Sequence, residues 1–394
     1  MLRGRVASFL QQIKKMDYFK ESLKLHAEHK GKMEIKSKFP LRNFEDLSVA
    51  YTPGVAEPCR KIADDVNDAY KYTTKANTVA VVTDGSAVLG LGNIGATAAL
   101  PVMEGKCLLF KKFAGVDAVP ICIETQDPDE IIDIVKNISP AYGGINLEDI
   151  KAPQCFYIEK KLKEILKIPV FHDDQHGTAI VCLAGLINAF KLTGRDFKTS
   201  KIVIAGAGAA GIAIAKILII RGVKNIILLD SKGVIGRSRK DLQFMKKEMA
   251  EITNPGNIVG GLKEAMLGAD VFIGVSKPKI VSSAMVKSMN DDAIVFALSN
   301  PVPEIDPEMA KKAGAAIVAT GRSDYPNQIN NVLAFPGIFK GALKLRNKQI
   351  TDKMKVNAAV ALAESVKNPS AAKIIPGVFD KGVAEIVARV VVRS

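Results

Sequence analysis

The sequence predicts an α/β protein, with an N-terminal α/β domain over residues 1–175 and a doubly wound parallel-sheet domain over residues 176–394. Three observations support this prediction. Short apolar strands alternate with helical stretches, which favours parallel sheets covered by helices. A glycine-rich strand–turn–helix begins at Lys201, and acidic pairs follow two apolar strands that precede it. The chain of 394 residues is also long enough for two domains of about 100–200 residues each.

The chain is basic, with a formal net charge of +14. A basic surface can bind nucleic acid. Here the Lys and Arg residues are spread along the chain, and no RNA-binding, zinc-finger or basic-zipper pattern is present. We therefore interpret the charge as a solvated surface and expect no nucleic-acid partner. There are two weaker alternatives. The positive charge could attract small anions, or the protein could associate with nucleic acid.

The cysteines, the histidines and the N-terminus indicate a cytoplasmic protein without a membrane partner. Five Cys residues form no C-x-x-C pair and only four His residues occur, so we expect reduced thiols and no zinc site. Arg3 and Arg5 precede only a brief apolar stretch, which does not resemble a secretory signal. The apolar run over 202–220 approaches membrane-spanning length, but its three glycines and Lys216 favour a buried strand–turn–helix.

The N-terminal stretch from Met1 to Lys38 is basic and helical in pattern, and we expect it to pack on a partner subunit. After it, Tyr51 stands at the start of a proline-punctuated turn, "VAYTPGVAEP". On these residues alone, Tyr51 is interpreted as a core or turn residue. Lys106, in "PVMEGKCLLF", is interpreted in the same way as a surface lysine, although burial could make it a base.

A G-x-G-x-x-G spacing occurs first at Gly90, Gly92 and Gly95. In a dinucleotide site this spacing lies between a strand and a helix, with an acid about 20 residues further on. Here the preceding strand is expected to end at Gly85, before the triplet, and Pro101 is expected to interrupt the helix. This copy is therefore interpreted either as a loop close to a small ligand or as a tight turn.

Two acidic pairs follow apolar strands: Glu148–Asp149 after "GGINL" and Asp173–Asp174 after "IPVFH". If these strands are parallel neighbours, the acids meet at one edge of the sheet, where ligands gather. Carboxylates at short range repel one another, and a hard cation such as Mg²⁺ or Mn²⁺ would relieve that repulsion. The alternative is that Asp173 or Asp174 caps the helix that follows.

The second glycine copy has the full context of a dinucleotide site of Rossmann type. "KIVIAG" reads as a strand, a helix follows, and "NIILLD" is the next strand, which ends at Asp230. Helix N–H groups at the loop can receive a pyrophosphate. We expect NAD because Asp230 should bind the ribose hydroxyls, although the basic residues after it leave NADP possible. The residues expected to bind the cofactor here are Gly206, Ala207, Gly208, Ala209, Ala210, Gly211 and Asp230.

Beyond this loop, further strands are expected near residues 271, 293 and 316, and helices after residue 335 are expected to return toward the first domain. We expect these helices to close the cleft between the domains.

Taken together, the motifs resemble those of the malic enzymes in their short bacterial and archaeal form. They lie in order between residues 47 and 337, over most of the chain. The stretches that carry the resemblance are "LSVAYTPGVAEPC", "VTDGSAVLGLGNIG", "LPVMEGK", "GGINLEDI", "FHDDQHGTA", "ALSNPVPEIDP" and "ATGRSDYPNQINNVLAFPG".

The resemblance implies oxidative decarboxylation of L-malate to pyruvate and CO₂, with NAD⁺ or NADP⁺ reduced and Mg²⁺ or Mn²⁺ required. It places the first domain at the centre of catalysis, the Gly90 loop beside the substrate, and the active protein in a homodimer. By motif, Lys106 resembles the general base and Tyr51 the general acid. Glu148, Asp149 and Asp174 resemble the metal ligands, Asp173 a residue supporting the base, and Asn300 and Asn331 residues that hold the substrate and the nicotinamide.

This chain differs from the longer malic enzymes in a residue that binds the substrate carboxylate. Longer malic enzymes carry an Arg just before the first glycine loop, whereas this chain has Ala87 there. Ser86, backbone N–H groups or Asn331 would have to hold the carboxylate instead. The alternatives to malate oxidation are a related metal-dependent dehydrogenase or decarboxylase for another 2-hydroxy acid, and a catalytically silent NAD-binding regulator.

Overall fold

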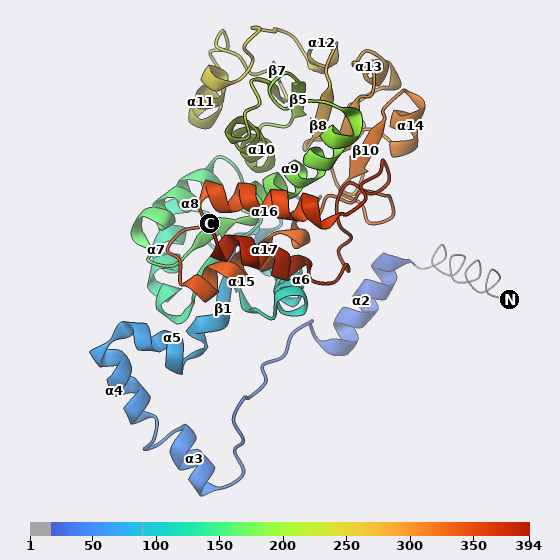
Figure 1. Ribbon diagram of the computed structural model, residues 1–394. Helices are drawn as coiled ribbons and strands as arrows, with labels where there is room; N and C mark the ends of the chain where they lie inside the picture. Colours follow the sequence, from blue (N-terminus) through green and yellow to red (C-terminus); the bar gives the residue numbers. More distant parts are fainter. Residues whose placement is uncertain (1–16, 89) are drawn as a thin grey trace, which may run out of the picture.

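The computed structural model describes residues 17–394 except residue 89, and it contains two β-sheets joined by one long buried helix. In Figure 1 the first sheet lies in the middle of the molecule and the second at the top. The prediction that Met1–Lys38 is helical is tested only from residue 17 onward, because residues 1–16 lie outside the described part.

The first sheet is parallel, and its strands lie in the order β2-β1-β3-β4. Three of its four strands are completely buried, which is typical of a parallel sheet covered on both faces. The strand order shows that β2 lies on one side of β1, whereas β3 and β4 lie on the other. The elements are β1 (Thr78–Thr83), α6 (Gly95–Ala114), β2 (Asp117–Cys122), α7 (Pro128–Ile138), β3 (Gly144–Leu147), α8 (Gln154–Ile165) and β4 (Val170–His172).

Helix α6 corrects the expectation that Pro101 breaks the chain after the first glycine loop. The helix runs through Pro101 for 20 residues. Its inward stripe includes Ala99, Met103 and Phe110, which are all fully buried, and this packing holds the helix together. Pro101 itself lies on the exposed side, where the carbonyl that loses its partner can meet water. The first glycine loop is thus also followed by a helix, although it still lies well past the end of β1.

Helix α9 (Asp173–Thr193) follows β4 directly and connects the two sheets. It is long and apolar enough to cross a membrane, but 72% of its apolar window is buried inside the protein. Asn188 on this helix donates hydrogen bonds to the carbonyls of Ala363 and Ile374, which fixes the C-terminal segment to it. Helix α9 is therefore the central core helix of the protein.

The second sheet has the strand order β10-β9-β8-β5-β6-β7. This is the doubly wound order of dinucleotide-binding domains, and it confirms the predicted fold. Strand β7 is a short antiparallel edge, so the sheet is mixed rather than wholly parallel. The predicted apolar run over 202–220 is divided into a strand and a helix, as expected. The elements are β5 (Lys201–Ala205), α10 (Ala209–Ile220), β6 (Asn225–Asp230), β7 (Gly233–Val234), α11 (Phe244–Ile252), α12 (Leu262–Met266), β8 (Val271–Gly274), α13 (Ser283–Lys287), β9 (Ile294–Ala297), α14 (Pro307–Lys312) and β10 (Ile317–Thr320).

The C-terminal helices return to the first sheet. Helices α15 (Phe335–Leu345), α16 (Asp352–Ser365) and α17 (Val383–Val392) pack against α6 and α9. The rings of Phe335 and Phe339 meet that of Phe110 on α6, with centroids 4.7 and 5.4 Å away. One apolar core consequently runs from the first sheet through α9 to the second sheet.

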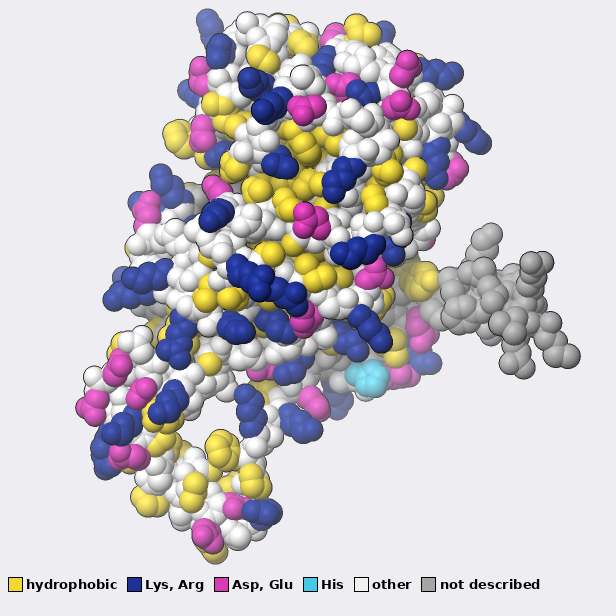
Figure 2. All heavy atoms as spheres, viewed as in Figure 1, with side chains coloured by type: hydrophobic (Ala, Val, Ile, Leu, Met, Phe, Trp, Pro, Cys, Tyr) yellow, Lys and Arg dark blue, Asp and Glu magenta, His cyan; other side chains and the backbone are white. Residues whose placement is uncertain are grey.

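The segment before β1 does not contribute to this core. It contains α2 (Tyr18–His29), α3 (Phe44–Ala50), α4 (Ala56–Asp64) and the short α5 (Ala69–Tyr72). None of these four helices has a buried residue. Figure 1 shows α3 and α4 projecting below the rest of the molecule, and Figure 2 shows an opening between them and the body.

Candidate active site

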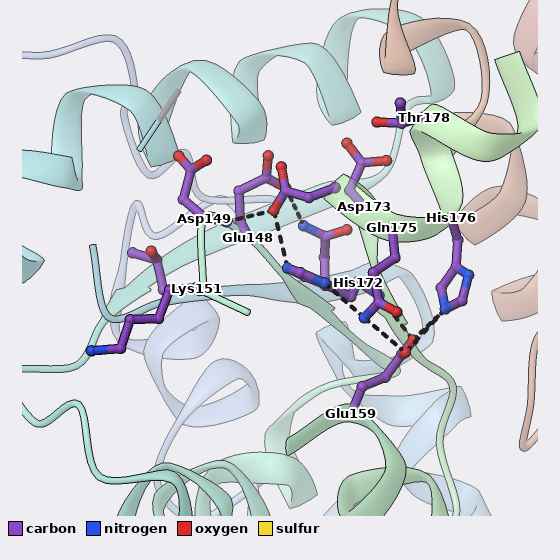
Figure 3. A network of polar contacts seen from close by, with 12 residues as sticks. Glu148, Asp149, Lys151, Glu159, His172, Asp173, Gln175, His176 and Thr178 are labelled. Atoms are coloured by element: carbon purple, nitrogen blue, oxygen red, sulfur yellow. Dashed lines mark hydrogen bonds and ion pairs between the residues drawn. The ribbon is translucent and has the colours of Figure 1, made fainter. Parts of the chain in front are cut away.

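Three carboxylates meet at the carboxyl ends of β3 and β4. The strands are parallel neighbours, with Leu147 paired to His172 at their ends. Glu148 and Asp149 follow β3, and Asp174 lies in the first turn of α9. One oxygen from each of these three residues lies within 4.8 Å of the others (Figure 3). The predicted grouping of the acids is therefore present in the folded chain.

This cluster fits a divalent cation by the chemistry of its donors. Burial, together with neighbouring carboxylates, raises the pKa of Glu148 well above its usual value and that of Asp149 to about 7. Burial acts on Asp174 in the same way, but the neighbouring His172 imidazole lowers the pKa of that carboxyl below its usual value. An all-oxygen set with concentrated negative charge suits Mg²⁺ or Mn²⁺.

Asp173 does not cap helix α9. His172 occupies the N-cap position, and Asp173 and Asp174 are the first two helical residues. Their carboxylates point toward the site instead of back to the backbone, except that Asp174 Oδ2 accepts a hydrogen bond of 2.8 Å from the Asp149 N–H. The helix-cap interpretation of these acids is therefore wrong.

Lys106 is buried between two of the acids. Its Nζ lies 2.7 Å from Glu148 Oε1 and 2.6 Å from Asp173 Oδ2, and its side chain is 11% exposed. The ring of Phe335 lies beneath it, 4.3 Å from Nζ to the centroid. Burial lowers the pKa of Lys106, but the two carboxylates outweigh that effect and raise it, so the side chain is an ammonium in this arrangement. The interpretation of Lys106 as a surface lysine is wrong.

Asn331 reaches the same carboxylate from the second half of the chain. Its Nδ2 donates to Asp173 Oδ2 over 3.1 Å, and its Oδ1 accepts from the Thr178 hydroxyl over 3.1 Å. Asp173 Oδ1 is buried and has no hydrogen-bond partner in the described chain. Thr178 was not predicted from the sequence, although it lies one helical turn beyond Asp174 on α9.

Ser86 lies beside the carboxylates, but its hydroxyl is already engaged. Its Oγ donates to Asp84 Oδ1 over 2.6 Å and accepts the N–H of Lys151 over 2.9 Å. The next N–H, that of Ala87, donates to the Asp149 carbonyl. These bonds fix the loop after β1 to the loop after β3, so Ser86 supports the carboxylate cluster through the backbone.

A second set of polar residues lies behind the cluster and was not predicted. His172 Nε2 lies 3.0 Å from Asp174 Oδ2, and its Nδ1 contacts Gln175. Gln175 in turn donates to the buried Glu159, which also contacts His176 (Figure 3). The sequence signal was the run of polar residues around the acidic pair, "HDDQH", at the start of an otherwise apolar helix.

The second glycine loop lines a groove of about 1020 Å³ at the carboxyl end of β5. Gly206, Ala207 and Gly208 form one wall of the groove. Ala209 and Ala210 are the first residues of α10, whose unpaired N–H groups suit a pyrophosphate. A Cβ at Gly211 would lie 1.7 Å from the Gly206 carbonyl oxygen, so only glycine fits there.

Asn300 follows β9, at the same edge of the second sheet, and meets the first glycine loop. A Cβ added at Gly90 would lie 3.3 Å from Pro301 Cδ and 3.5 Å from the Asn300 carbonyl oxygen. Gly90, Gly92 and Gly95 all have φ between 75° and 78°. The first glycine loop therefore lies where the two halves of the chain approach each other.

Asp230 also lines the groove, but its charge is balanced. Arg239 Nη1 lies 2.7 Å from Asp230 Oδ1, and Lys246 Nζ lies 2.6 Å from Oδ2. Burial raises the pKa of Asp230, but these contacts outweigh it and lower the pKa to about 2. The preference for NAD was expected to weaken if basic residues after Asp230 balanced its charge, and in the folded chain Arg239 and Lys246 do balance it.

Tyr51 is not brought to this site. It directly follows α3, within the segment before β1, and is 67% exposed. In the part of the chain that the structure describes, no tyrosine hydroxyl hydrogen-bonds to Lys106 or to the carboxylates around it. Of the two interpretations of Tyr51, the core residue is wrong and the turn residue is right, because Tyr51 starts the turn over residues 51–55. A single chain does not place Tyr51 as an acid beside Lys106.

Comparison with known proteins gives consistent matches over both halves of the chain. Residues 30–163 match the malic enzyme N-terminal domain family, and residues 175–393 match the malic enzyme NAD binding domain family. The chain is 56% identical over 382 residues to the bifunctional malic/malolactic enzyme of Bacillus subtilis, covering 96% of this chain and 93% of that protein.

Two further proteins differ in the cofactor that their names state. The NADP-dependent malic enzyme of Rhizobium meliloti is 52% identical over 88% of this chain and 46% of its own length. The crystal structure of the NAD-dependent malic enzyme of Thermotoga maritima superposes with a TM-score of 0.92 at 50% identity, covering 94% of this chain and 98% of that one.

Proposed function

The chain belongs to the malic enzyme family, and from this membership we propose how its own residues perform the reaction. It is an NAD(P)-dependent malic enzyme that oxidises and decarboxylates L-malate to pyruvate and CO₂. The observation that carries the residue assignments is Lys106, held between Glu148 and Asp173 beside the three-carboxylate cluster. The division into a catalytic domain over 1–175 and a cofactor domain over 176–394 is part of the proposal.

Lys106 is the group that exchanges the proton of the C2 hydroxyl. It takes that proton as the C2 hydride leaves for the nicotinamide. For this step it must first become neutral, and the Asp173 carboxylate holds its Nζ in place and accepts a hydrogen bond from it. Asn331 holds Asp173 in turn. After the C3–C4 bond breaks, CO₂ leaves and Tyr51 supplies the proton that C3 needs to give pyruvate.

Glu148, Asp149 and Asp174 would hold Mg²⁺ or Mn²⁺, as their burial and their three converging oxygens support. Such an ion supplies a Lewis acid for the C2 oxygen and positive charge that lowers the proton affinity of a neighbouring amine. Asn300 and Asn331 are proposed to bind the substrate and the nicotinamide end of the cofactor. Ser86 is proposed to act as a positioning residue that holds the loop carrying Ala87.

The groove around Gly206 is proposed to bind NAD and to accept NADP as well. Asp230 remains available to the ribose hydroxyls, because a carboxylate can accept several hydrogen bonds. Arg239 and Lys246 balance its charge and line the same groove, so a 2′-phosphate would meet cations there as well as the carboxylate. The sequence-based expectation was NAD with NADP possible, and the cations in the groove favour acceptance of both cofactors.

We further propose a cytoplasmic homodimer that works without a nucleic-acid or membrane partner. Five free thiols support a reducing compartment. The apolar helix α9 is a core element, and the projecting N-terminal segment offers a surface for a second subunit.

The direct test is NADH and NADPH formation from L-malate with Mn²⁺ or with EDTA, for the wild type and Lys106→Ala. Metal-dependent reduction that yields pyruvate, and a loss of at least about 100-fold in Lys106→Ala, is the expected result. Mn²⁺ should also raise the melting temperature of the wild type and not that of Asp174→Asn, because an ion that binds only the folded chain stabilises it. No reduction of either cofactor with malate would contradict the proposal.

A further inference from the structure

We propose that Glu304 is a positioning residue of the active site, which ties the loop that lines the cofactor groove to the loop that carries Asn300. Its carboxylate hydrogen-bonds to the backbone of both loops at once. This inference rests on the proposed role of Asn300 in holding the substrate and the nicotinamide. It deepens that role, because it names the buried group that fixes where Asn300 lies relative to the cofactor.

The first observation is the pair of hydrogen bonds that Glu304 accepts. Its Oε1 accepts the N–H of Ser276 and its Oε2 accepts that of Ser299, each over 3.0 Å. Ser276 follows β8, and Ser299 follows β9. These strands are parallel neighbours, and Gly274 at the end of one pairs with Ala297 at the end of the other. One side chain therefore joins the carboxyl ends of two adjacent strands, at the sheet edge where cofactors bind.

The second observation is that the carboxylate of Glu304 is completely buried without a cation. Its exposed fraction is 0%, and it forms no ion pair with any residue that the structure describes. Burial raises the pKa of Glu304, and only backbone N–H groups oppose that rise. A buried carboxylate costs free energy that an apolar side chain of similar size would not. The acid at this position is therefore explained by the two N–H groups that it holds and not by packing.

The end of β8 leaves room for this side chain. A Cβ added at Gly274 would overlap the carboxyl group of Glu304, so the strand has to end in glycine. The two loops also meet through their backbones. The N–H of Lys279 donates to the Pro303 carbonyl over 3.0 Å, and that of Val281 donates to the Glu304 carbonyl over the same distance. The Glu304 carboxylate is thus the inner end of a continuous contact between the two loops.

On one side of Glu304, the loop after β8 lies against the second glycine loop. Ser276 and Lys277 line the cofactor groove. A Cβ added at Gly206 would lie 3.1 Å from Ser276 Cβ, which shows how closely the two loops approach. Ser276 is therefore part of the groove wall, and Glu304 holds it from behind.

On the other side, Ser299 is followed directly by Asn300. A Cβ added at Gly321, just after β10, would lie 3.1 Å from Asn300 Cγ, so the amide lies directly against the backbone there. The carbonyl of Asn300 lies near Gly90 of the first glycine loop, which belongs to the other half of the chain. The hydrogen bond from Ser299 to Glu304 therefore fixes Asn300 where the substrate side and the cofactor side of the site meet.

The test compares Glu304→Gln with Glu304→Met in the full-length chain. Gln keeps one acceptor oxygen and turns an NH₂ group toward the other N–H, whereas Met removes both acceptors. We expect kcat/KM for malate to fall about tenfold in Glu304→Gln and further in Glu304→Met, because a displacement of about 1 Å can cost about 100-fold. The affinity for ADP-ribose, which lacks the nicotinamide, should change much less.

Asp270→Asn is the matched control for the loss of a buried carboxylate from the same sheet. Asp270 precedes β8 at the opposite edge, where it accepts the Lys201 N–H over 2.7 Å and pairs with Arg195. This variant should lose at least as much thermal stability as Glu304→Gln but keep the wild-type kcat/KM for malate. Wild-type kcat/KM in Glu304→Gln, or an equal loss in both variants, would overturn the proposal.

Hydrogen exchange gives a measurement that does not depend on turnover. ADP-ribose should slow exchange in the wild-type peptide that contains Ser299 and Asn300, because Glu304 links that peptide to the groove. In Glu304→Gln this response should disappear, while the peptide that contains Gly206 stays protected. An equal response in both proteins would overturn the inference even if malate were oxidised normally. A Glu304-dependent response in a chain that does not oxidise malate would contradict the proposed function and leave this link in place.

Discussion

At the scale of single residues, neighbouring cations balance the charge of Asp230 in the groove beside β6. Asp230 closes its strand as predicted, but Arg239 and Lys246 hold its carboxylate from both sides. The sequence contains these cations 9 and 16 residues further on. Sequence spacing does not show which of the many nearby Lys and Arg residues fold back onto the strand end.

Arg239→Ala should change the choice of cofactor. The substitution frees a negative charge at Asp230 and removes a cation from the groove, so both effects act against a 2′-phosphate. We expect the KM for NADP to rise about tenfold or more, since a charge-assisted hydrogen bond contributes about 1.5–3 kcal/mol. The KM for NAD should change much less. Steady-state kinetics with both cofactors measures the ratio.

Arg237→Ala is the matched control. Arg237 is two residues away and exposed, and it pairs with Glu251 rather than with Asp230. This variant should leave the cofactor ratio unchanged. Equal changes for NAD and NADP in Arg239→Ala would show that the arginine only supports the fold of the groove.

At the scale of elements, the turn from β5 to α10 contains two glycines, Gly208 and Gly211, that are needed for different reasons. Gly211 allows the helix to approach the strand, because a Cβ there would overlap the Gly206 carbonyl. At Gly208 a Cβ would meet nothing within 4 Å in the protein alone. Only a bound ligand would oppose a side chain at Gly208.

Gly208→Ala and Gly211→Ala should therefore fail in different ways. We expect Gly208→Ala to melt near the wild-type temperature but to bind NAD at least about tenfold more weakly, because the Cβ blocks approach of the pyrophosphate. Gly211→Ala should unfold more easily, by about 1–3 kcal/mol, since the backbone must shift. Thermal unfolding and cofactor titration separate the two. Normal NAD affinity in Gly208→Ala would move the cofactor away from this loop.

Helices α8 and α9 are joined through the buried carboxylate of Glu159. It lies 2.7 Å from Lys163 Nζ and 2.8 Å from His176 Nε2, and it accepts the His172 N–H. Burial raises the pKa of Glu159, but the contacts with His176 and Lys163 outweigh it and hold the pKa well below its usual value. Because burial lowers the pKa of His176 to about 4, His176 acts at neutral pH as an uncharged hydrogen-bond partner and Lys163 is the charged one. Glu159 is therefore ionised in the folded chain at neutral pH.

This pKa difference predicts how stability depends on acid. The contribution of Glu159 is fully present above the pKa that it has in the unfolded chain, near 4.5, and it is lost as the pH falls through the lower folded-state value. Glu159→Gln should cost about 3 kcal/mol at pH 7 by leaving Lys163 without its partner. The difference from wild type should shrink on acidification below about pH 4.5. Denaturant unfolding at several pH values measures this.

Glu164→Gln on the same helix provides the comparison. Glu164 is about half exposed and pairs with Lys161 in solvent, so its loss should cost less than about 1 kcal/mol at any pH. A Glu159→Gln variant as stable as this control at pH 7 would mean that the buried network contributes no net stability.

The elements that could be predicted from sequence are those with local signals. The strands around the acidic pairs and the β5–α10–β6 unit carry apolar periodicity and turn residues, and they lie where expected. Helix α6 was misjudged at Pro101, because the apolar stripe that sustains it is a tertiary effect. The Glu159 network escaped prediction because its partners lie on two helices and meet only after the chain has folded.

At the scale of the whole molecule, the two halves divide the chemistry between them. The first half supplies the carboxylates and Lys106, and the second supplies the cofactor groove. Asn331 joins them, because it donates a hydrogen bond to Asp173 and accepts one from Thr178. One core also passes through α9 into both sheets. Resemblance to the family placed Tyr51 at this centre, but the folded single chain holds it outside. The sequence does not show this separation, because no local pattern fixes where the segment before β1 lies relative to Lys106.

The arm, residues 33–64 before β1, should control the assembly state without contributing to the core, because none of its residues is buried in one chain. In a Phe39→Asp/Phe44→Asp double variant, two charges replace rings that are 69% and 87% exposed in one chain. We expect the mass in solution to fall from twice 42.3 kDa to a single chain. Malate oxidation should be lost with it, while the far-ultraviolet circular dichroism of the body remains.

Phe379→Asp is the control for the charge itself, since Phe379 is 83% exposed but lies far along the chain from the arm, near Phe113. This variant should remain an active dimer. If the double variant on the arm stayed dimeric and active, the apolar residues of the arm would not be the interface, and some other surface would have to cover them. If it became monomeric but kept full activity, one chain would hold a complete site and the dimer would not be needed for catalysis.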